Sequence, residues 1–205
     1  PRLGIDVQQD DLLAHGVLVA GGTFSDVTSF DPLVSRIATN TVVFGEPEHA
    51  SADWYPARFA TINRFLTIDG QSHERLTLVP GQYVADPISP TIGTQRLYET
   101  LDLVVYHAPF TDTDFLAPNI WQVDAISATS GLYFRVLVED DADTLERVLI
   151  LYRHPGELAW TAADLTYDLE TGWARARVTQ TGGPVEYLAQ AVDPSGNVAL
   201  AMDYG

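Results

Sequence analysis

The chain has 205 residues, of which 46% are apolar, and its formal charge is −17 from 28 acidic and 11 basic residues. All the basic residues are arginine. Because the acidic residues far outnumber them, the chain lacks a basic footprint, and the composition argues against binding to nucleic acid or to an anionic membrane surface. The sequence contains no cysteine, which excludes disulfides, thiolate metal sites and a cysteine nucleophile. No apolar stretch is long enough for membrane insertion as a helix. The favoured partners are other proteins or identical subunits, cations and neutral glycans.

Short alternating apolar runs, separated by Gly, Pro, Asn and Asp, predict an all-β protein. In the N-terminal part, strands are expected over residues 17–20, 35–44, 57–68, 74–79, 82–85 and 96–107. Single helical turns are expected at residues 12–13 and 31–37. Two loops rich in Gly and Pro, residues 45–53 and 86–93, are expected to be exposed.

A segment with a proline at each end, Pro109 and Pro118, is the predicted domain boundary. Proline biases the residue before it away from helix and is tolerated at the start of an edge strand. The expected organisation is therefore an N-terminal β domain over residues 1–108, a linker over 109–118 and a second domain over 119–205.

The C-terminal region has the clearest strand pattern. Seven runs are expected as strands, over residues 119–126, 131–138, 147–153, 160–167, 173–178, 185–192 and 197–202. This count and spacing are typical of a seven-stranded immunoglobulin-like sandwich. Asp193-Pro194-Ser195-Gly196-Asn197 is expected to form the tight turn of the last hairpin. The predicted fold class is all-β, with two sandwich-type domains of which the C-terminal one is immunoglobulin-like.

Residues 183–198 read GPVEYLAQAVDPSGNV, an alternating aromatic strand that runs into an Asp-x-x-Gly-Asn turn. This segment resembles the last hairpin of the bacterial immunoglobulin-like domains found in large secreted proteins. The resemblance extends over about residues 117–205. It implies the sandwich architecture and a generic use as a spacer or adhesive unit, and it implies no specific activity.

A second, weaker resemblance lies within about residues 54–108. The segments RLTLVPGQY, residues 75–83, and QRLYETLDLVVY, residues 95–106, are similar to the non-catalytic β-rich region beside gingipain-type cysteine peptidases. The catalytic portion of that family, with its Cys and His, is absent from this sequence. The resemblance therefore implies an accessory origin and transfers no catalytic residue.

Acidic residues gather in the linker, in the loop after residue 138 and in the last hairpin. In an immunoglobulin-like sandwich these three segments share one end, so they are expected to meet at the domain junction. Carboxylate and carbonyl oxygens suit calcium, although no EF-hand loop is present. The candidate ligands are Asp112, Asp114, Asp140, Asp141, Asp143 and Asp193. The ordinary alternative is a solvated acidic rim, because loops are acidic in most acidic proteins.

Other side-chain patterns favour structural explanations. None of the five histidines has a Gly-x-Ser-x-Gly context or the spacing of a catalytic triad, so all are expected to be ordinary surface residues. No carboxylate pair stands out as a glycosidase site. Packing is expected for Trp121, and Trp160 could pair with Trp173 across neighbouring strands. Trp54-Tyr55 is the most plausible exception, as a binding platform.

The sequence thus predicts a non-catalytic structural or accessory module of an exported bacterial surface protein, used for spacing, adhesion or assembly. The start at Pro1, with Met202 as the only methionine, suggests removal of an upstream segment and an extracellular or cell-surface location. One alternative is a processed subunit of a filament or surface layer that donates its first strand, residues 1–7, to a neighbour. Another is a fragment of a secreted peptidase or other hydrolase.

Overall fold

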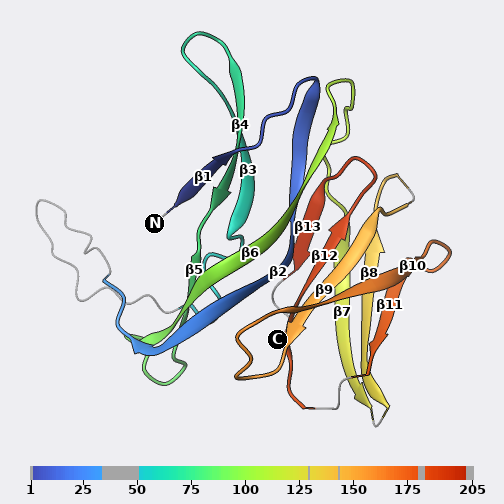
Figure 1. Cartoon of the computed structure of the whole chain (residues 1–205). Coiled ribbons are helices and arrows are strands. Elements are labelled where there is room, and N and C mark those ends of the chain that lie inside the picture. Colours follow the sequence, from blue (N-terminus) through green and yellow to red (C-terminus); the bar gives the residue numbers. More distant parts are fainter. Residues whose placement is uncertain (1, 34–50, 129, 143, 180–182, 202–205) are drawn as a thin grey trace, which may run out of the picture.

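The computed structural model describes residues 2–33, 51–128, 130–142, 144–179 and 183–201 (Figure 1). All regular secondary structure in these residues consists of β-strands, which confirms the all-β prediction. The N-terminal strands are β1 (Leu3–Asp6), β2 (Leu12–Phe30), β3 (Ala60–Leu66), β4 (Ser72–Leu78), β5 (Gly81–Ala85) and β6 (Gly93–Pro109). The C-terminal strands are β7 (Asn119–Ala128), β8 (Gly131–Glu139), β9 (Arg147–Arg153), β10 (Thr161–Asp168), β11 (Trp173–Val178), β12 (Glu186–Val192) and β13 (Val198–Ala201).

The C-terminal strands form the predicted immunoglobulin-like sandwich. Their pairing order is β13-β12-β9-β10-β11-β8-β7, and β10 changes partner along its length. Residues 161–165 of β10 pair with β9, whereas residues 166–168 pair with β11. One layer therefore contains β7, β8, β11 and the end of β10, and the other contains β13, β12, β9 and the start of β10. Apart from this division of β10, the strands are distributed as in immunoglobulin constant-type domains. The predicted last hairpin is also confirmed, since Gly196 N donates to Asp193 O at 3.1 Å.

The N-terminal strands form two three-stranded sheets, β2-β6-β5 and β1-β4-β3. β2 is 19 residues long, far longer than the expected strand over residues 17–20, and it also contains the predicted helical turn at residues 12–13, which is wrong. The pairing of β2 with β6 shifts register at four places. Each shift interrupts the simple alternation of side chains, so the sequence shows only short fragments of this strand. The strand expected over residues 35–44 lies outside the described residues, as does most of the expected turn at 31–37.

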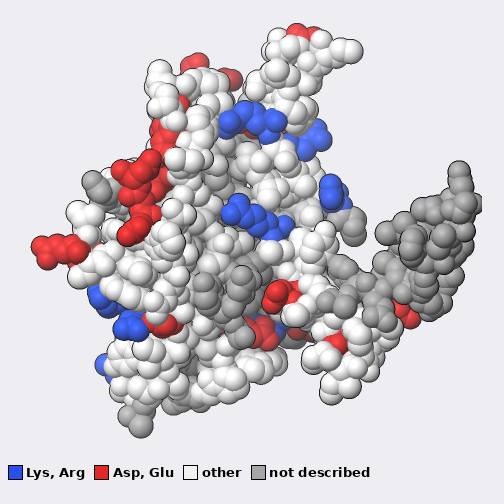
Figure 2. Space-filling view, turned by 180° about the vertical axis from the view of Figure 1, so that it is seen from behind, with Lys and Arg blue, Asp and Glu red and all other residues white. Residues whose placement is uncertain are grey.

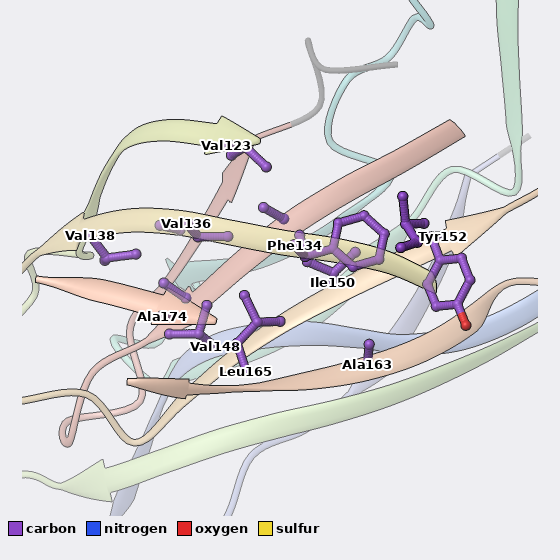
Figure 3. Packing of buried hydrophobic residues seen from close by; sticks show 14 residues of the cluster. Val123, Phe134, Val136, Val138, Val148, Ile150, Tyr152, Ala163, Leu165 and Ala174 are labelled. Atoms are coloured by element: carbon purple, nitrogen blue, oxygen red, sulfur yellow. The ribbon is translucent and has the colours of Figure 1, made fainter. Parts of the chain in front are cut away.

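β9 and β12 are buried on both faces. From β9, Val148 and Ile150 point into the sandwich core, where Figure 3 shows them beside Phe134 and Ala174. The intervening residues of β9 belong to a second cluster, which we call the shared core, together with buried residues of β2 and β6. The buried residues of the shared core are Leu18, Val19, Phe24, Phe59, Tyr98, Leu149, Leu151, Leu188 and Val192. The N-terminal β2 sheet thus packs on the outer face of the sandwich.

Polar contacts also connect β2 with the sandwich. The buried Gln190 on β12 accepts a hydrogen bond from Val19 N at 2.8 Å and donates one to Val19 O at 2.7 Å. These bonds satisfy the main chain of β2 beside one of its register shifts. Farther along, Phe24 N donates to Leu158 O and Trp160 N donates to Gly22 O. Residues 110–118, which connect β6 to β7, contain no strand. Independent folding of residues 1–108 and 119–205 stays a prediction.

No helix that could cross a membrane occurs in the part of the chain that the structure describes.

Candidate binding groove

A cavity of about 430 Å³ opens between β3 of the N-terminal region and β13 of the sandwich. β2 forms its floor through residues 15–17 and Val19, and Ala117 of the connecting segment lies at its border. Among the described residues, β3 pairs only with β4, and β13 pairs only with β12. The cavity is therefore a groove between two strand edges, and we call it the edge groove.

The main-chain groups of both strands face this groove. Val79 N donates to Phe59 O at 2.8 Å, which fixes the alternation of hydrogen bonds along the β3–β4 pair. The main-chain groups of Ala60 and Ile62 then point away from β4. On the other side, Asp193 N donates to Asn197 O at 3.2 Å.

The same alternation turns the main-chain groups of Val198 and Leu200 away from β12. Ala60, Ile62, Val198 and Leu200 all line the edge groove. Among the described residues, β3 and β13 are each the last strand of their sheet. The groove is thus bordered on both sides by the outer edge of a terminal strand.

His15 lies in the floor of the groove and stacks on Phe115 with ring centroids 4.7 Å apart. Both ring nitrogens are buried, and neither has a hydrogen-bond partner in the described residues. His107 is half-buried, with Nε2 2.9 Å from Val7 O, while Nδ1 of His154 lies 3.1 Å from Pro184 O. The expectation that every histidine is an ordinary surface residue is therefore wrong for His15. His73, His107 and His154 are half-buried, and His49 lies outside the described residues.

The edge groove is less acidic than the rest of the molecule. Within the described residues its lining includes the exposed Arg58 and no Asp or Glu. Arg58 forms no ion pair with another residue in the described part of the chain. By contrast, Arg64 Nε lies 2.7 Å from Glu74 Oε1. Figure 2 shows one face of the molecule, on which acidic side chains gather in a column and arginines lie mainly elsewhere. The described lining of the groove thus has a basic side chain and no acidic one, in a strongly acidic chain.

A second polar site, the arginine cluster, joins β2 and β6 to β9 and β12. It consists of Arg96, Arg153, Asp26 and Glu186. Arg96 Nε donates to Asp26 at 2.9 Å, and Arg153 Nη2 lies 2.6 Å from Glu186. Burial alone would lower the pKa of Arg96, but the hydrogen bond and charge of Asp26 raise it. The guanidinium group of Arg96 therefore stays charged in the interior.

Aromatic rings enclose the arginine cluster. The guanidinium of Arg96 lies 4.1 Å from the ring centroids of both Phe24 and Trp54. Trp54 also borders a pocket of about 270 Å³, which Arg96 and Trp160 line as well. Stacking on Arg96 gives Trp54 a packing function, and a binding function for Trp54-Tyr55 stays a prediction.

The other tryptophans lie on or beside the sandwich. Trp121 is 61% exposed on the terminal strand β7 and donates its Nε1 hydrogen bond to Glu139 at 3.0 Å, so it packs at the edge of the sheet and not in the core. The expected pairing of Trp160 with Trp173 is wrong. Trp173 lies opposite Asp168 in the β10–β11 pair, whereas the ring of Trp160 packs 5.9 Å from Phe24 in the shared core.

The predicted calcium ligands lie in the segments expected to meet. Burial, with added repulsion from Asp193, Asp141 and Asp114, raises the pKa of Asp140. Burial and the charge of Asp114 likewise raise the pKa of Asp193. Ser195 Oγ donates to Asp112 at 2.9 Å and Asn197 Nδ2 donates to Asp114 O at 3.2 Å, so the linker and the last hairpin lie close together. Residues 116–117 of the linker and residues 140–141 of the β8–β9 loop line one pocket. Asp143 lies outside the described residues.

Several of these carboxylates already have protein donors. Asp193 is fully buried and accepts hydrogen bonds from Asn197 N and Nδ2, each at 2.8 Å. Hydrogen bonds from Asp114 N and from the Ser195 hydroxyl lower the pKa of Asp112. Among the described residues, no three acidic or histidine side chains are arranged to hold a metal ion. Calcium binding at this junction stays a prediction.

The N-terminal strand is not free in this chain. β1 pairs antiparallel with β4, from Leu3 opposite Leu78 to Asp6 opposite Arg75. A donated first strand would have to leave β4 before it could join a neighbour. The filament alternative therefore loses the free strand on which it rested.

Comparison of the chain with protein-family models, with curated proteins and with solved structures gives no match. The edge groove was not expected from the sequence. The immunoglobulin-like strand order does place the last strand at a sheet edge, and this was the one available signal. The approach of β3 to that edge depends on the packing of β2 against the sandwich, which local patterns do not encode.

Proposed function

We propose that the chain is a non-catalytic structural module of an exported bacterial surface protein. It acts at the cell surface or outside the cell as a rigid spacer and assembly unit, with proteins as its partners. The observation that carries this proposal is the shared core, in which β2 and β6 pack against the outer face of the sandwich.

The contacts between the two regions support a spacer that does not bend at its centre. The apolar shared core, the paired hydrogen bonds of Gln190 with Val19 and the arginine cluster all span the same boundary. Buried charged hydrogen bonds have strict geometry, so they oppose sliding of one layer over the other. A binding partner on one region would thus be held at a fixed position relative to the other region.

Rigidity can be measured with spin labels because the sequence has no native cysteine. A double variant Ile88→Cys/Leu169→Cys places labels on the two regions, at residues that are 90% and 61% exposed. We expect one narrow distance distribution, similar in width to that of Ile126→Cys/Leu169→Cys within the sandwich. A broad or bimodal distribution only in the first variant would contradict the spacer proposal.

The location is tested on intact cells of the source bacterium. Antibodies against the chain are expected to label unpermeabilised cells, and protease added outside is expected to remove the signal. A signal that requires permeabilisation and resists protease would contradict the proposed location.

A further inference from the structure

Unpaired strand edges are usually protected, because they can pair with any extended chain that they meet. The edge groove has two such edges, β3 and β13, on opposite sides of one cavity. Ala60 and Ile62 on one side, and Leu200 on the other, direct main-chain groups into it, whereas Val198 N lies against Gly16 of β2. An extended segment lying between these edges could hydrogen-bond with either of them.

We propose that the edge groove binds an extended segment of a partner protein by β-strand addition. This inference specifies the contact made by the proposed assembly unit and therefore rests on that proposal. Successive outward-facing residues of a strand are about 7 Å apart, so the described edge of β3 provides sites for about four or five residues of a bound segment. The cavity of about 430 Å³ fits a short segment of this kind with small side chains.

The lining determines the chemistry of the bound segment. Val19, Phe59 and Val198 provide apolar surface, so apolar side chains are expected at alternate positions of the segment. Arg58 is the exposed charge at the groove, and the described lining has no acidic side chain. An acidic residue near Arg58 is thus expected at one end of the segment.

The depth of the floor is fixed where β2 meets the last hairpin. A Cβ atom on Gly16 would lie 2.4 Å from Gly196 O and 2.9 Å from Val198 N, so these main chains already touch. The bound segment is therefore expected to lie above Gly16, alongside the two edges. Small residues are favoured at the position that faces this contact.

The test begins with a displayed library of random peptides of about nine residues, which span about 30 Å when extended. The full chain is the bait. We expect enriched sequences to alternate apolar residues and to carry an acidic residue near one end. Failure to enrich any sequence, or enrichment without alternation, would overturn the proposal. Concentration-dependent self-association that occupies the groove would also overturn it, because the occupant would then be a second copy.

An N-methyl scan of the best peptide tests for main-chain recognition. Methylation removes one main-chain donor and leaves the side chain unchanged. We expect affinity to fall at least about fivefold at every second position and to change little at the positions between, because only alternate amides face a given strand edge. Equal effects at all positions would show that the peptide is not bound as an added strand.

Two pairs of variants locate the binding site. Ala117→Trp narrows the groove, whereas Ala142→Trp adds the same side chain to an exposed position on the β8–β9 loop. Arg58→Glu reverses the charge at the groove, and the exposed Arg2 serves as its control through Arg2→Glu. The first member of each pair is expected to weaken peptide binding about tenfold or more, and the controls less than about twofold.

Equal effects within each pair would overturn the assignment to the groove. Circular dichroism and melting of each variant confirm that the fold is retained. The spin-label distances between the two regions do not depend on peptide binding. Failure of strand addition and failure of the rigid-spacer proposal are therefore distinguishable.

Discussion

The two regions of the molecule differ in how they obtain a core. The sandwich encloses its own cluster, in which all the fully buried residues come from β7 to β13. The β2 sheet buries its apolar side chains largely against four residues of the sandwich, Leu149, Leu151, Leu188 and Val192. The folded N-terminal region therefore depends on the sandwich more than the sandwich depends on it. Neighbouring residues of β9 belong to different cores, since Ile150 lies in the sandwich core and Leu151 in the shared core. Substitutions at these two positions can therefore test the dependence.

The largest effects are expected from β9. Ile150→Ala in the sandwich core and Leu151→Ala in the shared core should each lower the free energy of unfolding by about 2–5 kcal/mol. Hydrogen exchange of the main-chain amides distinguishes the two variants. Ile150→Ala is expected to reduce protection in both β2 and β8, because the N-terminal region loses its support when the sandwich opens. Leu151→Ala is expected to reduce protection mainly in β2. Unchanged protection of β2 in Ile150→Ala would contradict the dependence.

The arginine cluster should have the next largest effect. Arg96→Met removes a buried cation and leaves Asp26 with only the longer contact to Arg153, at 3.6 Å. We expect a loss of about 2–4 kcal/mol, because an uncompensated charge stays at the boundary of the two regions. Arg147→Met, which breaks a more exposed pair with Asp164, is the control and should cost less than about 1 kcal/mol. Denaturant titration measures both, and similar losses would contradict a special function of the cluster.

The same difference between regions explains what the sequence could predict. In the sandwich, six of the seven expected strands lie within two residues of the observed bounds, and Met202, the end of the seventh, lies outside the described residues. Side chains there alternate regularly, and the turns contain Gly and Asn. In β2, four register shifts break the alternation, so the sequence predicts a strand that ends at residue 20, whereas β2 continues through Gly21-Gly22 to Phe30. The uninterrupted apolar run Val148 to Tyr152 is typical of a strand buried on both faces, so it is the one sequence feature that indicates a second layer.

The predicted site was anticipated only in part. The meeting of Asp114, Asp140 and Asp193 follows from the strand order of the sandwich, and the sequence provides that order. The hydrogen bonds that Asn197 donates to Asp193 could not be predicted, because they depend on rotamers in a buried turn. The edge groove could not be predicted either, because it forms between β3 and β13, which are more than a hundred residues apart in the sequence.

Calcium bound at the junction would hold the connecting segment, residues 110–118, against the sandwich. It would therefore change the comparison between the two regions. Bound at a hundred times its dissociation constant, calcium would add about 2.7 kcal/mol to stability. The prediction requires the melting temperature to fall when a chelator removes the ion, and to recover with calcium but not with equal ionic strength of sodium. An unchanged melting temperature would leave only the solvated acidic rim.

The smallest effect concerns the charge of Asp140. Because burial and neighbouring carboxylates raise its pKa in the folded chain, the folded state binds this proton more tightly than the unfolded state does. Stability from this group therefore falls as pH rises from about 3.9 through the raised pKa, and the full penalty is present at about pH 7. Asp140→Asn removes the charge, and its Oδ1 can still accept the hydrogen bond from Ala142 N.

We expect Asp140→Asn to stabilise the chain at about pH 7 by less than about 1 kcal/mol and to lose that advantage at about pH 3.5. Asp112→Asn is the matched control with the opposite sign, because the pKa of Asp112 is lowered by hydrogen bonds from Asp114 N and Ser195. Its contribution is present above about pH 3.9 and disappears as pH falls through the lowered pKa. Urea titrations at several pH values measure both variants. Destabilisation by Asp140→Asn at about pH 7 would mean that the carboxylate has a favourable cation beside it, and added calcium would then be the first ion to test.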